Sequence, residues 1–249
     1  MAPRILKKRI VRAIQVGAAM FAGETTETRI ELRYRLRARA VEKSCVFIEN
    51  NSRHFTNYFD RHWDLRSDAV KQVAKEGLLL EFGVNRGRSA NFICQLLDEA
   101  ADKRTLYGFD TFTGLTEDWG GVGRAGLFDR NGKPPHLHKR VQLVTGDILQ
   151  TLEPFLQAHL EPIAFIHIDT DTYTPCAHIL RNVRARLRNG TIIVFDELLG
   201  YPNYHSHELK ALSEELPRTS YEFKSFGVSH KRANLIKAVI EIVDAEILK

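Results

Sequence analysis

Cysteine is scarce in this chain of 249 residues, and the three that occur, Cys45, Cys94 and Cys176, are widely spaced. An odd number of cysteines without a C-x-x-C pair argues against a disulfide scaffold and a cysteine-based zinc ribbon, and it fits a reducing compartment. Long apolar runs are also lacking, since none approaches the roughly 18 residues of a membrane-spanning helix. We therefore expect a cytoplasmic protein without a membrane span.

Internal repeats and low-complexity segments are absent from the sequence as well. With 43% hydrophobic and 27% charged residues, the composition is that of a globular protein, which excludes a disordered or collagenous chain. A chain of this length buries a sizeable core without disulfide or metal staples. An α/β domain of this size is common as a single unit.

Acidic residues are few in the first 40 positions, which hold ten Lys and Arg against three Glu and so carry a net charge of +7. Such a segment could contact nucleic acid, anionic lipid or an acidic partner, but we favour a solvated helix face and do not expect nucleic acid as a partner. The first Ser or Thr is Thr25, and Arg12 and Gln15 interrupt the apolar stretch. Neither a mitochondrial nor a secretory signal is indicated, and we interpret the segment as part of the mature protein.

Residues 1–75 lack a regular alternation of strand and helix patterns. Residues 30–38 alternate apolar with charged side chains as a strand would, although Leu32 and Leu36 also suit a helix, so both interpretations stay open. Residues 64–73 are amphipathic. We predict that residues 1–75 form a basic, mainly helical appendage that covers a site or makes an oligomer contact, and we expect a homodimer.

From residue 76 onward, short apolar runs alternate with helical periodicity. The expected core strands are 78–82, 106–109, 141–144, 163–168 and 191–195, and a terminal pair follows at 221–226 and 233–242. Strands so rich in Ile, Leu and Val are buried on both faces, and the helices between them imply right-handed crossovers. We predict that residues 76–249 form an α/β domain with a doubly wound, mostly parallel sheet.

A long segment rich in Gly and Pro, residues 113–139, interrupts this alternation. Loops of such length in compact domains are usually functional or mobile. Most of the ten histidines are best interpreted as surface-loop residues. If one is catalytic, we prefer His136 or His138, because this loop could carry either over the site as a base.

The first core strand leads into an E-x-G-x-x-x-G turn that runs from Glu81 through Gly83 and Gly87 to Ser89. It is neither the G-x-G-x-x-G fingerprint nor a P-loop. Its glycines permit a positive φ and close backbone approach, and the following helix offers free amides to an anionic group. In open parallel sheets ligands bind at such carboxyl ends of strands, so the turn is a candidate ligand site or a purely structural turn.

Acidic residues stand at the ends of the other strands too. Asp110 is placed to accept hydrogen bonds from ribose hydroxyls, and Asp147 from an exocyclic amine such as that of adenine, although each could instead cap a helix or a turn. Asp169, Asp196 and Glu197 end two strands that should be neighbours. Carboxylates brought so close raise one another's pKa, and a hard cation such as Mg²⁺ relieves the repulsion.

Five segments together, LLLEFGVNRGRS, LYGFDTFTGLTEDW, VTGDILQTLEPFL, FIHIDTDTY and GTIIVFDE, resemble class I S-adenosylmethionine-dependent methyltransferases. More narrowly, they resemble the macrocin O-methyltransferase family, whose members methylate hydroxyls on sugars and other natural products. The match covers roughly residues 65–215. The resemblance implies a Rossmann-like fold, S-adenosylmethionine as cofactor, Mg²⁺ as the assisting metal and a small-molecule hydroxyl as acceptor.

The resemblance also implies roles for individual residues. The cofactor-binding residues would be Glu81, Gly83, Gly87 and Ser89 near the methionine part, Asp110, Thr111 and Gly114 around the ribose, and Asp147 by the adenine. The metal ligands would be Asp169, Asp196 and Glu197. Apart from the resemblance, Asp169 is our candidate for the proton acceptor. Glu197 departs from the adjacent aspartates of the family, and Thr172 stands where catechol-type relatives have a lysine base.

Two hypotheses from other classes compete with this one. Asp169-Thr170-Asp171 could be the D-x-D metal motif of a nucleotide-sugar glycosyltransferase, although that would not explain the E-x-G-x-x-x-G turn. Alternatively, the chain could be a non-catalytic binding protein that has a methyltransferase fold and a basic N-terminal arm.

Overall fold

The computed structural model describes residues 26–229 and 235–249, and the chain divides into two compact units, 1–39 and 40–249. Helix α2 (Thr26–Asn51) includes the boundary between them. Residues 30–38 are therefore helical, which resolves the ambiguity between strand and helix. Residues 1–25 of the expected appendage lie outside the described part of the chain. The function of this appendage as a lid or an oligomer contact stays a prediction.

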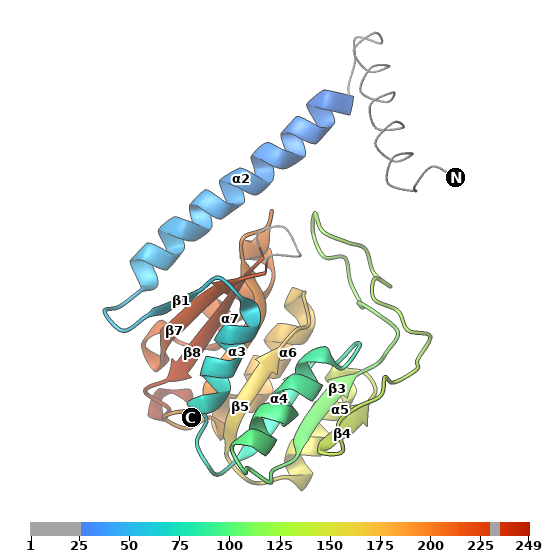
Figure 1. Cartoon of the computed structure of the whole chain (residues 1–249), viewed down its shortest axis with the longest axis vertical. Helices are drawn as coiled ribbons and strands as arrows, with labels where there is room; N and C mark the ends of the chain where they lie inside the picture. Colours follow the sequence, from blue (N-terminus) through green and yellow to red (C-terminus); the bar gives the residue numbers. More distant parts are fainter. Residues whose placement is uncertain (1–25, 230–234) are drawn as a thin grey trace. The chain divides into compact units, whose positions relative to one another are not determined.

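The described residues form one sheet of eight strands in the order β1-β7-β8-β6-β5-β2-β3-β4 (Figure 1). All neighbouring strands are parallel except β8, which pairs antiparallel with both β6 and β7. The predicted doubly wound, mostly parallel sheet is thus confirmed. The strands are β1 (Asn57–Phe59), β2 (Leu78–Phe82), β3 (Leu106–Asp110), β4 (Val141–Thr145), β5 (Ile163–Ile168), β6 (Ile192–Leu199), β7 (Tyr221–Val228) and β8 (Ile236–Ile242).

Helices cover both faces of this sheet because its central strands are apolar at successive positions. In β2, Leu79 packs into the cluster formed with α3 (His62–Lys71) and α4 (Arg88–Glu99). Its neighbours Leu78 and Leu80 pack into the opposite cluster, with α5 (Ile148–Ala158), α6 (Tyr173–Val183) and α7 (Glu208–Glu215). Short 3-10 helices occur at η1 (Arg184–Arg186), η2 (Tyr204–Ser206), η3 (Arg218–Ser220) and η4 (Glu246–Leu248).

The unit that contains the sheet begins at residue 40, before the boundary at 75 that the sequence suggests. Strand β1 pairs with β7 at the edge of the sheet, where Asn57 lies opposite Ser225. In helix α3, Leu65 is fully buried and lies against Gly227 of β7. Residues 57–71 therefore contribute an edge strand and a core helix, so the segment 1–75 is not a separate appendage throughout its length.

The order of the strands places a crevice at the carboxyl ends of β2 and β5. From β2 the chain proceeds outward to β3 and β4, and it then returns to the other side of β2 as β5. The turns at these ends are joined by backbone hydrogen bonds, in which the Asp169 N–H donates to Phe82 (2.8 Å) and the Gly83 N–H to Phe109 (2.9 Å). Such a reversal of strand order is where doubly wound sheets bind ligands.

None of the described helices combines the length and apolar character needed to cross a membrane.

We expect Leu65→Ala to lower the free energy of unfolding by about 2–5 kcal/mol, the range for truncating a buried leucine. The side chain is fully buried between α3 and β7. Leu160→Ala is the matched control, because Leu160 is 73% exposed. Urea denaturation of both variants measures the difference, and equal losses would contradict the assignment of α3 to the core.

Candidate active site

A cavity opens at the carboxyl ends of the central strands. Five of the eight predicted cofactor residues line it, namely Gly83, Asp110, Thr111, Gly114 and Asp147. Asp169, which follows β5, lines it as well. The cavity thus brings together residues that follow β2, β3, β4 and β5, as expected for a ligand that lies across the crevice.

The other three predicted cofactor residues, Glu81, Gly87 and Ser89, do not line this cavity. Glu81 is fully buried in β2. Gly87 caps the start of α4 at a φ of +69°, and a Cβ there would lie 2.4 Å from a methyl group of Leu137. In this structure these residues shape the turn and its packing, and their contact with a cofactor stays a prediction.

Gly83 is required by a close approach of two backbone segments. Its φ is +91°, and a Cβ built on it would lie 1.9 Å from the carbonyl oxygen of Asp169. A side chain of any size would separate the end of β2 from the end of β5. The glycine of the E-x-G turn therefore holds the floor of the crevice together.

Asp110 and Asp147 both line the cavity and both stabilise local backbone. The Asp110 carboxylate accepts hydrogen bonds from the backbone N–H groups of Asn85 and Phe112, each at 2.6 Å. Asp147 caps α5 and accepts from the Leu149 N–H at 3.0 Å. The capping interpretation is thus correct for Asp147. Each carboxylate oxygen has a second lone pair, so these bonds leave both residues able to accept from a ligand.

The long loop contributes to the cavity through Leu115, Phe128 and Arg130, which line its wall. The two histidines preferred as possible bases do not line it. The Nε2 atom of His138 lies 3.1 Å from a carboxylate oxygen of Asp98 on α4. The histidines of this loop therefore have no contact with the cavity that would support a catalytic role.

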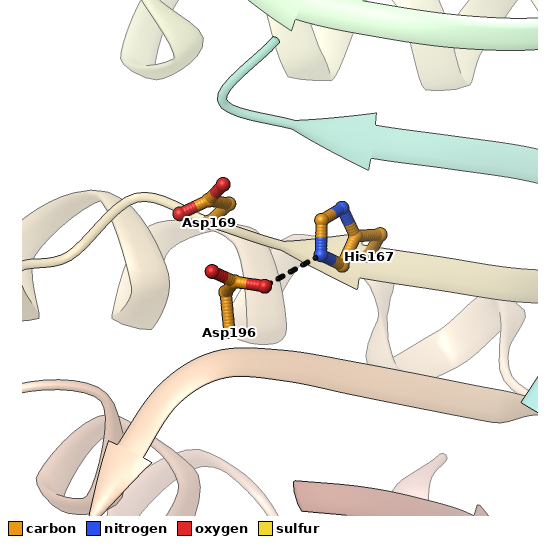
Figure 2. Close-up of side chains that lie close together, drawn as sticks. All are labelled: His167, Asp169 and Asp196. Atoms are coloured by element: carbon orange, nitrogen blue, oxygen red, sulfur yellow. Dashed lines mark hydrogen bonds and ion pairs between the residues drawn. The ribbon is translucent and has the colours of Figure 1, made fainter. Parts of the chain in front are cut away.

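Asp196 is the centre of a buried network of charges. Its carboxylate pairs with the guanidinium of Arg66 and with the Lys237 ammonium, whose Nζ lies 2.5 Å away, and it contacts His167 Nε2 at 3.3 Å (Figure 2). Burial raises the pKa of Asp196, but the two cations outweigh burial and hold this pKa well below its usual value. Asp196 is therefore ionised and already has its counter-charges within the chain.

His167 extends the network to β2. Its Nδ1 atom lies 3.0 Å from Glu81 Oε1, and its imidazole is fully buried on β5. Burial lowers the pKa of His167, but hydrogen bonds to Asp196 and Glu81 raise it above its ordinary value. The predicted cofactor residue Glu81 thus connects to Asp196 through a histidine.

A second group of carboxyl groups lies beside this network. The residues are Asp169, Asp171, Glu197 and Glu208, the last at the start of α7. Burial and the charge of Asp196 raise the pKa of Asp169 to about 6, and burial and the charge of Asp169 raise that of Glu208 to about 8. Burial and neighbouring carboxylates also raise the pKa values of Asp171 and Glu197 well above their ordinary values. Of the three acids expected to repel one another, Asp169 and Glu197 thus have raised pKa values, whereas the pKa of Asp196 is lowered.

The predicted metal ligands are distributed between two sets of possible donor atoms. In the described part of the chain, donor atoms of His167, Asp169 and Asp196 lie within 4.8 Å of one another, as do those of Asp169, Asp171 and Glu197. Asp169 belongs to both sets, whereas Asp196 and Glu197 belong to one each. The set of Asp169, Asp196 and Glu197 stays a prediction.

Sequence reasoning missed Arg66 and Lys237, the two buried cations of the site. Both carried a signal, because Arg66 lies on the buried face of α3 beside Leu65, and Lys237 interrupts the apolar run of β8. A basic residue in a core element requires a buried acid as partner. The sequence could not indicate which acid.

Comparisons with known proteins find a domain family that part of the chain matches. Residues 80–198 match the family model of a methyltransferase domain. The resemblance to class I S-adenosylmethionine-dependent methyltransferases of the macrocin O-methyltransferase kind is confirmed. The chain carries a methyltransferase domain. No protein among the curated sequences matches the chain.

Solved structures similar to this methyltransferase include the calicheamicin methyltransferase CalS11, with a TM-score of 0.57 and 23% identity over 89% of this chain and 95% of that one. An apo structure of CalS11 is described as a TDP-rhamnose 3′-O-methyltransferase. It gives a TM-score of 0.52 and 25% identity, over 89% of this chain and 97% of that one. The structure of the O-methyltransferase NovP gives a TM-score of 0.53 and 19% identity, over 73% of this chain and 79% of that one.

Gly83→Ala should destabilise the methyltransferase more than Gly190→Ala does. Gly190 has a similar φ of +87° but no atom within 4 Å of a built Cβ, so its substitution adds only backbone strain, about 1 kcal/mol. At Gly83 the new methyl group also meets the Asp169 carbonyl. Thermal melting of the two variants measures the difference, and equal shifts would contradict the close approach of the two turns.

Proposed function

We propose that this protein is an S-adenosylmethionine-dependent O-methyltransferase that acts on a hydroxyl group of a sugar or a natural product and is assisted by a divalent cation such as Mg²⁺. One observation carries the proposal. A single cavity is lined by Asp110 and Asp147 and also by Asp169 and Asp171. The acids predicted to bind the cofactor and the candidate catalytic carboxylates therefore open onto the same space.

The cofactor would lie across the ends of β2, β3 and β4. Asp110 would accept hydrogen bonds from the ribose hydroxyls and Asp147 from the adenine amine, with Thr111 and Gly114 beside the ribose. Gly83 would allow the methionine part to approach the backbone at the crevice. Because Asp169 follows the neighbouring strand β5, this arrangement directs the methyl end of the cofactor toward the carboxylates.

In the proposed reaction the acceptor oxygen attacks the methyl carbon, an oxygen–carbon bond forms and the carbon–sulfur bond breaks. The hydroxyl proton goes to Asp169. Without a cation, burial and the charge of Asp196 raise the pKa of Asp169 to about 6, so its carboxylate is ionised at neutral pH and able to accept a proton. Holding the oxygen in line with the methyl–sulfur bond is the other contribution that the chain's residues make.

The carboxylates beside Asp169 fit a hard cation. They are buried, they supply only oxygen donors, and their mutual repulsion needs a positive partner. When bound, a divalent cation would lower the pKa of a coordinated hydroxyl. The resemblance assigns the ligands as Asp169, Asp196 and Glu197, with Asp169 common to both groups of donor atoms.

The class of acceptor is suggested by CalS11, which is described as acting on TDP-rhamnose. We propose a sugar hydroxyl as the first acceptor to test. The proposal keeps a homodimer as the assembly, and α2 supports it through the exposed apolar side chains of Leu32, Tyr34 and Leu36.

Calorimetry should show that the full-length protein binds S-adenosylhomocysteine and not a nucleoside diphosphate. Mass spectrometry should then detect a methylated product when S-adenosylmethionine, Mg²⁺ and a panel of sugar and glycoside acceptors, TDP-rhamnose included, are supplied. Excess EDTA should abolish turnover. Preference for the nucleoside diphosphate would favour the glycosyltransferase alternative, and full turnover in EDTA would exclude the metal role.

Asp110→Ala should weaken S-adenosylmethionine binding by about 1.5–3 kcal/mol, the range for hydrogen bonds to a charged group. The substitution also removes the acceptor that holds the Asn85 and Phe112 amides at the cavity wall. Asp68→Ala on α3 is the control, because Asp68 does not line the cavity. Calorimetry that finds the same affinity for both variants would show that the ribose lies elsewhere.

A further inference from the structure

Helix α2 contains the boundary between the two units of the chain, and its two halves have different surroundings. From Ala40 onward the helix belongs to the unit that contains the sheet. There Ser44 is fully buried, and its hydroxyl oxygen accepts a hydrogen bond from the Gly200 N–H (3.0 Å). Residues 26–39 belong to the other unit. The exposed surface of this first half therefore has to be explained separately.

An apolar stripe runs along this first half. Leu32 and Leu36 are 58% and 48% exposed, and they lie on one side of the helix because they are four positions apart. Every second position from 33 to 39 is an exposed arginine, namely Arg33, Arg35, Arg37 and Arg39. At 3.6 residues per turn, the first and third of these arginines flank the leucines on one side, and the second and fourth flank them on the other. The solvated helix face favoured from the sequence accounts for the arginines but not for the exposed leucines between them.

The excess of positive charge is confined to the unit that contains these arginines. Residues 1–39 hold ten Lys and Arg against three Glu, which gives a net charge of +7. The other 210 residues hold 26 basic and 28 acidic side chains, which gives a net charge of −2. The rest of the chain is therefore too weakly acidic to neutralise this unit, and an anionic partner outside the chain fits it.

A second copy of the chain does not supply this partner. It carries the same net charge of +7 on the same residues, and like charges repel one another. A homodimer that buries Leu32 and Leu36 would bring the arginines of two copies together and raise the local positive charge. The partner is therefore anionic and differs from the chain itself.

Anionic lipid matches both kinds of side chain on this surface, whereas nucleic acid matches one. Phosphate groups of either partner attract arginine. At a bilayer, Leu32 and Leu36 can enter the boundary between the headgroups and the acyl chains, while the flanking arginines extend their charged ends to the headgroups. A nucleic-acid backbone offers the leucines no apolar surface. The alternation of arginine and leucine thus favours lipid.

The sequence before α2 has the same character. Leu6, Ile10 and Ile14 recur at every fourth position among five basic residues, namely Arg4, Lys7, Lys8, Arg9 and Arg12. A basic segment with apolar residues at this spacing is typical of chains that bind a membrane surface. Residues 1–25 lie outside the described part of the chain, so only their composition supports a lipid partner.

We propose that the first half of α2, residues 26–39, is a docking surface for an anionic phospholipid bilayer, with Leu32 and Leu36 at the acyl boundary and the arginines on both sides at the headgroups. The protein then lies on the membrane surface and does not span it. The inference goes beyond the proposed function, because it concerns where the protein acts and not the reaction. Attachment by one short apolar stripe and several cations is reversible and depends on the ionic strength.

Co-sedimentation of the full-length protein with vesicles tests the inference. One set of vesicles consists of phosphatidylcholine, and in the other a quarter of this lipid is replaced by phosphatidylserine. The wild type should sediment with the second set and remain in solution with the first. Raising the ionic strength from about 0.1 M to about 1 M shortens the Debye length from about 10 Å to about 3 Å, and it should release most of the bound protein.

The decisive comparison is between two pairs of arginines. Arg33→Gln/Arg37→Gln removes two charges beside the leucine stripe. Arg124→Gln/Arg184→Gln, the matched control, removes two exposed charges from the unit that contains the sheet. The first pair should weaken vesicle binding at least about tenfold, because each basic residue near an anionic surface contributes a factor of about five. The control pair should bind as the wild type does, which separates a local surface from attraction by the overall charge.

A second pair of variants tests the apolar contact. Leu32→Gln/Leu36→Gln should weaken binding to the anionic vesicles at least about tenfold, since two leucines are withdrawn from the acyl boundary. Leu160→Gln/Val243→Gln, which substitutes residues that are 73% and 38% exposed in the other unit, should leave binding unchanged. Circular dichroism and thermal melting should show that each variant is folded, as expected for exposed positions.

Binding of the wild type to neither set of vesicles, or equally to both, would overturn the inference. So would equal binding by the two arginine pairs, or unchanged binding by the leucine pair. If one pair does not fold, the other pair and the dependence on lipid and salt decide the question. A fluorescent single-stranded RNA is the competing probe, and a wild-type protein that binds it but not the vesicles overturns the inference in favour of nucleic acid.

Discussion

The ion pairs of the buried Asp196 carboxylate are the constraint on which the candidate site depends. They join β6 to α3 through Arg66 and to β8 through Lys237, and His167 extends the network to Glu81 of β2. Removing one partner from a buried pair leaves an uncompensated charge, which is strongly destabilising. The network therefore fixes one helix and four strands around the carboxyl end of β6.

Because Arg66 and Lys237 pair with Asp196, the carboxyl groups beside it repel one another when they are ionised. Asp169, Asp171, Glu197 and Glu208 are all buried, and all have raised pKa values. Such a group is unfavourable for folding when it is ionised and has no counter-ion. This unfavourable energy makes the cluster suited to a cation and to a proton acceptor, which are the two functions the proposed reaction needs.

Much of the fold could be predicted from the sequence, since the apolar runs that become β2, β3, β4, β5 and β6 are short and uniform. Their burial on both faces requires covering helices and therefore a doubly wound sheet. Strand β1 could not be predicted, because it has three residues and depends on pairing with β7, which lies far along the chain. The start of the sheet-bearing unit could not be predicted for the same reason, since α3 becomes a core helix only through its contact with β7.

The sequence by itself determined which residue types stand at each strand end: Gly83, Asp110, Asp147 and the acids that follow β5 and β6. Periodicity places these ends, and the parallel sheet then brings them to one edge. Only the tertiary structure decided how the acids divide. Asp196 and Glu197 are neighbours in the chain, and nothing local distinguishes them. Arg66 and Lys237 lie 130 and 41 residues away from Asp196, and long-range packing alone brings both cations to it. Of the two, Lys237 also lies 3.8 Å from Glu197, farther than from Asp196.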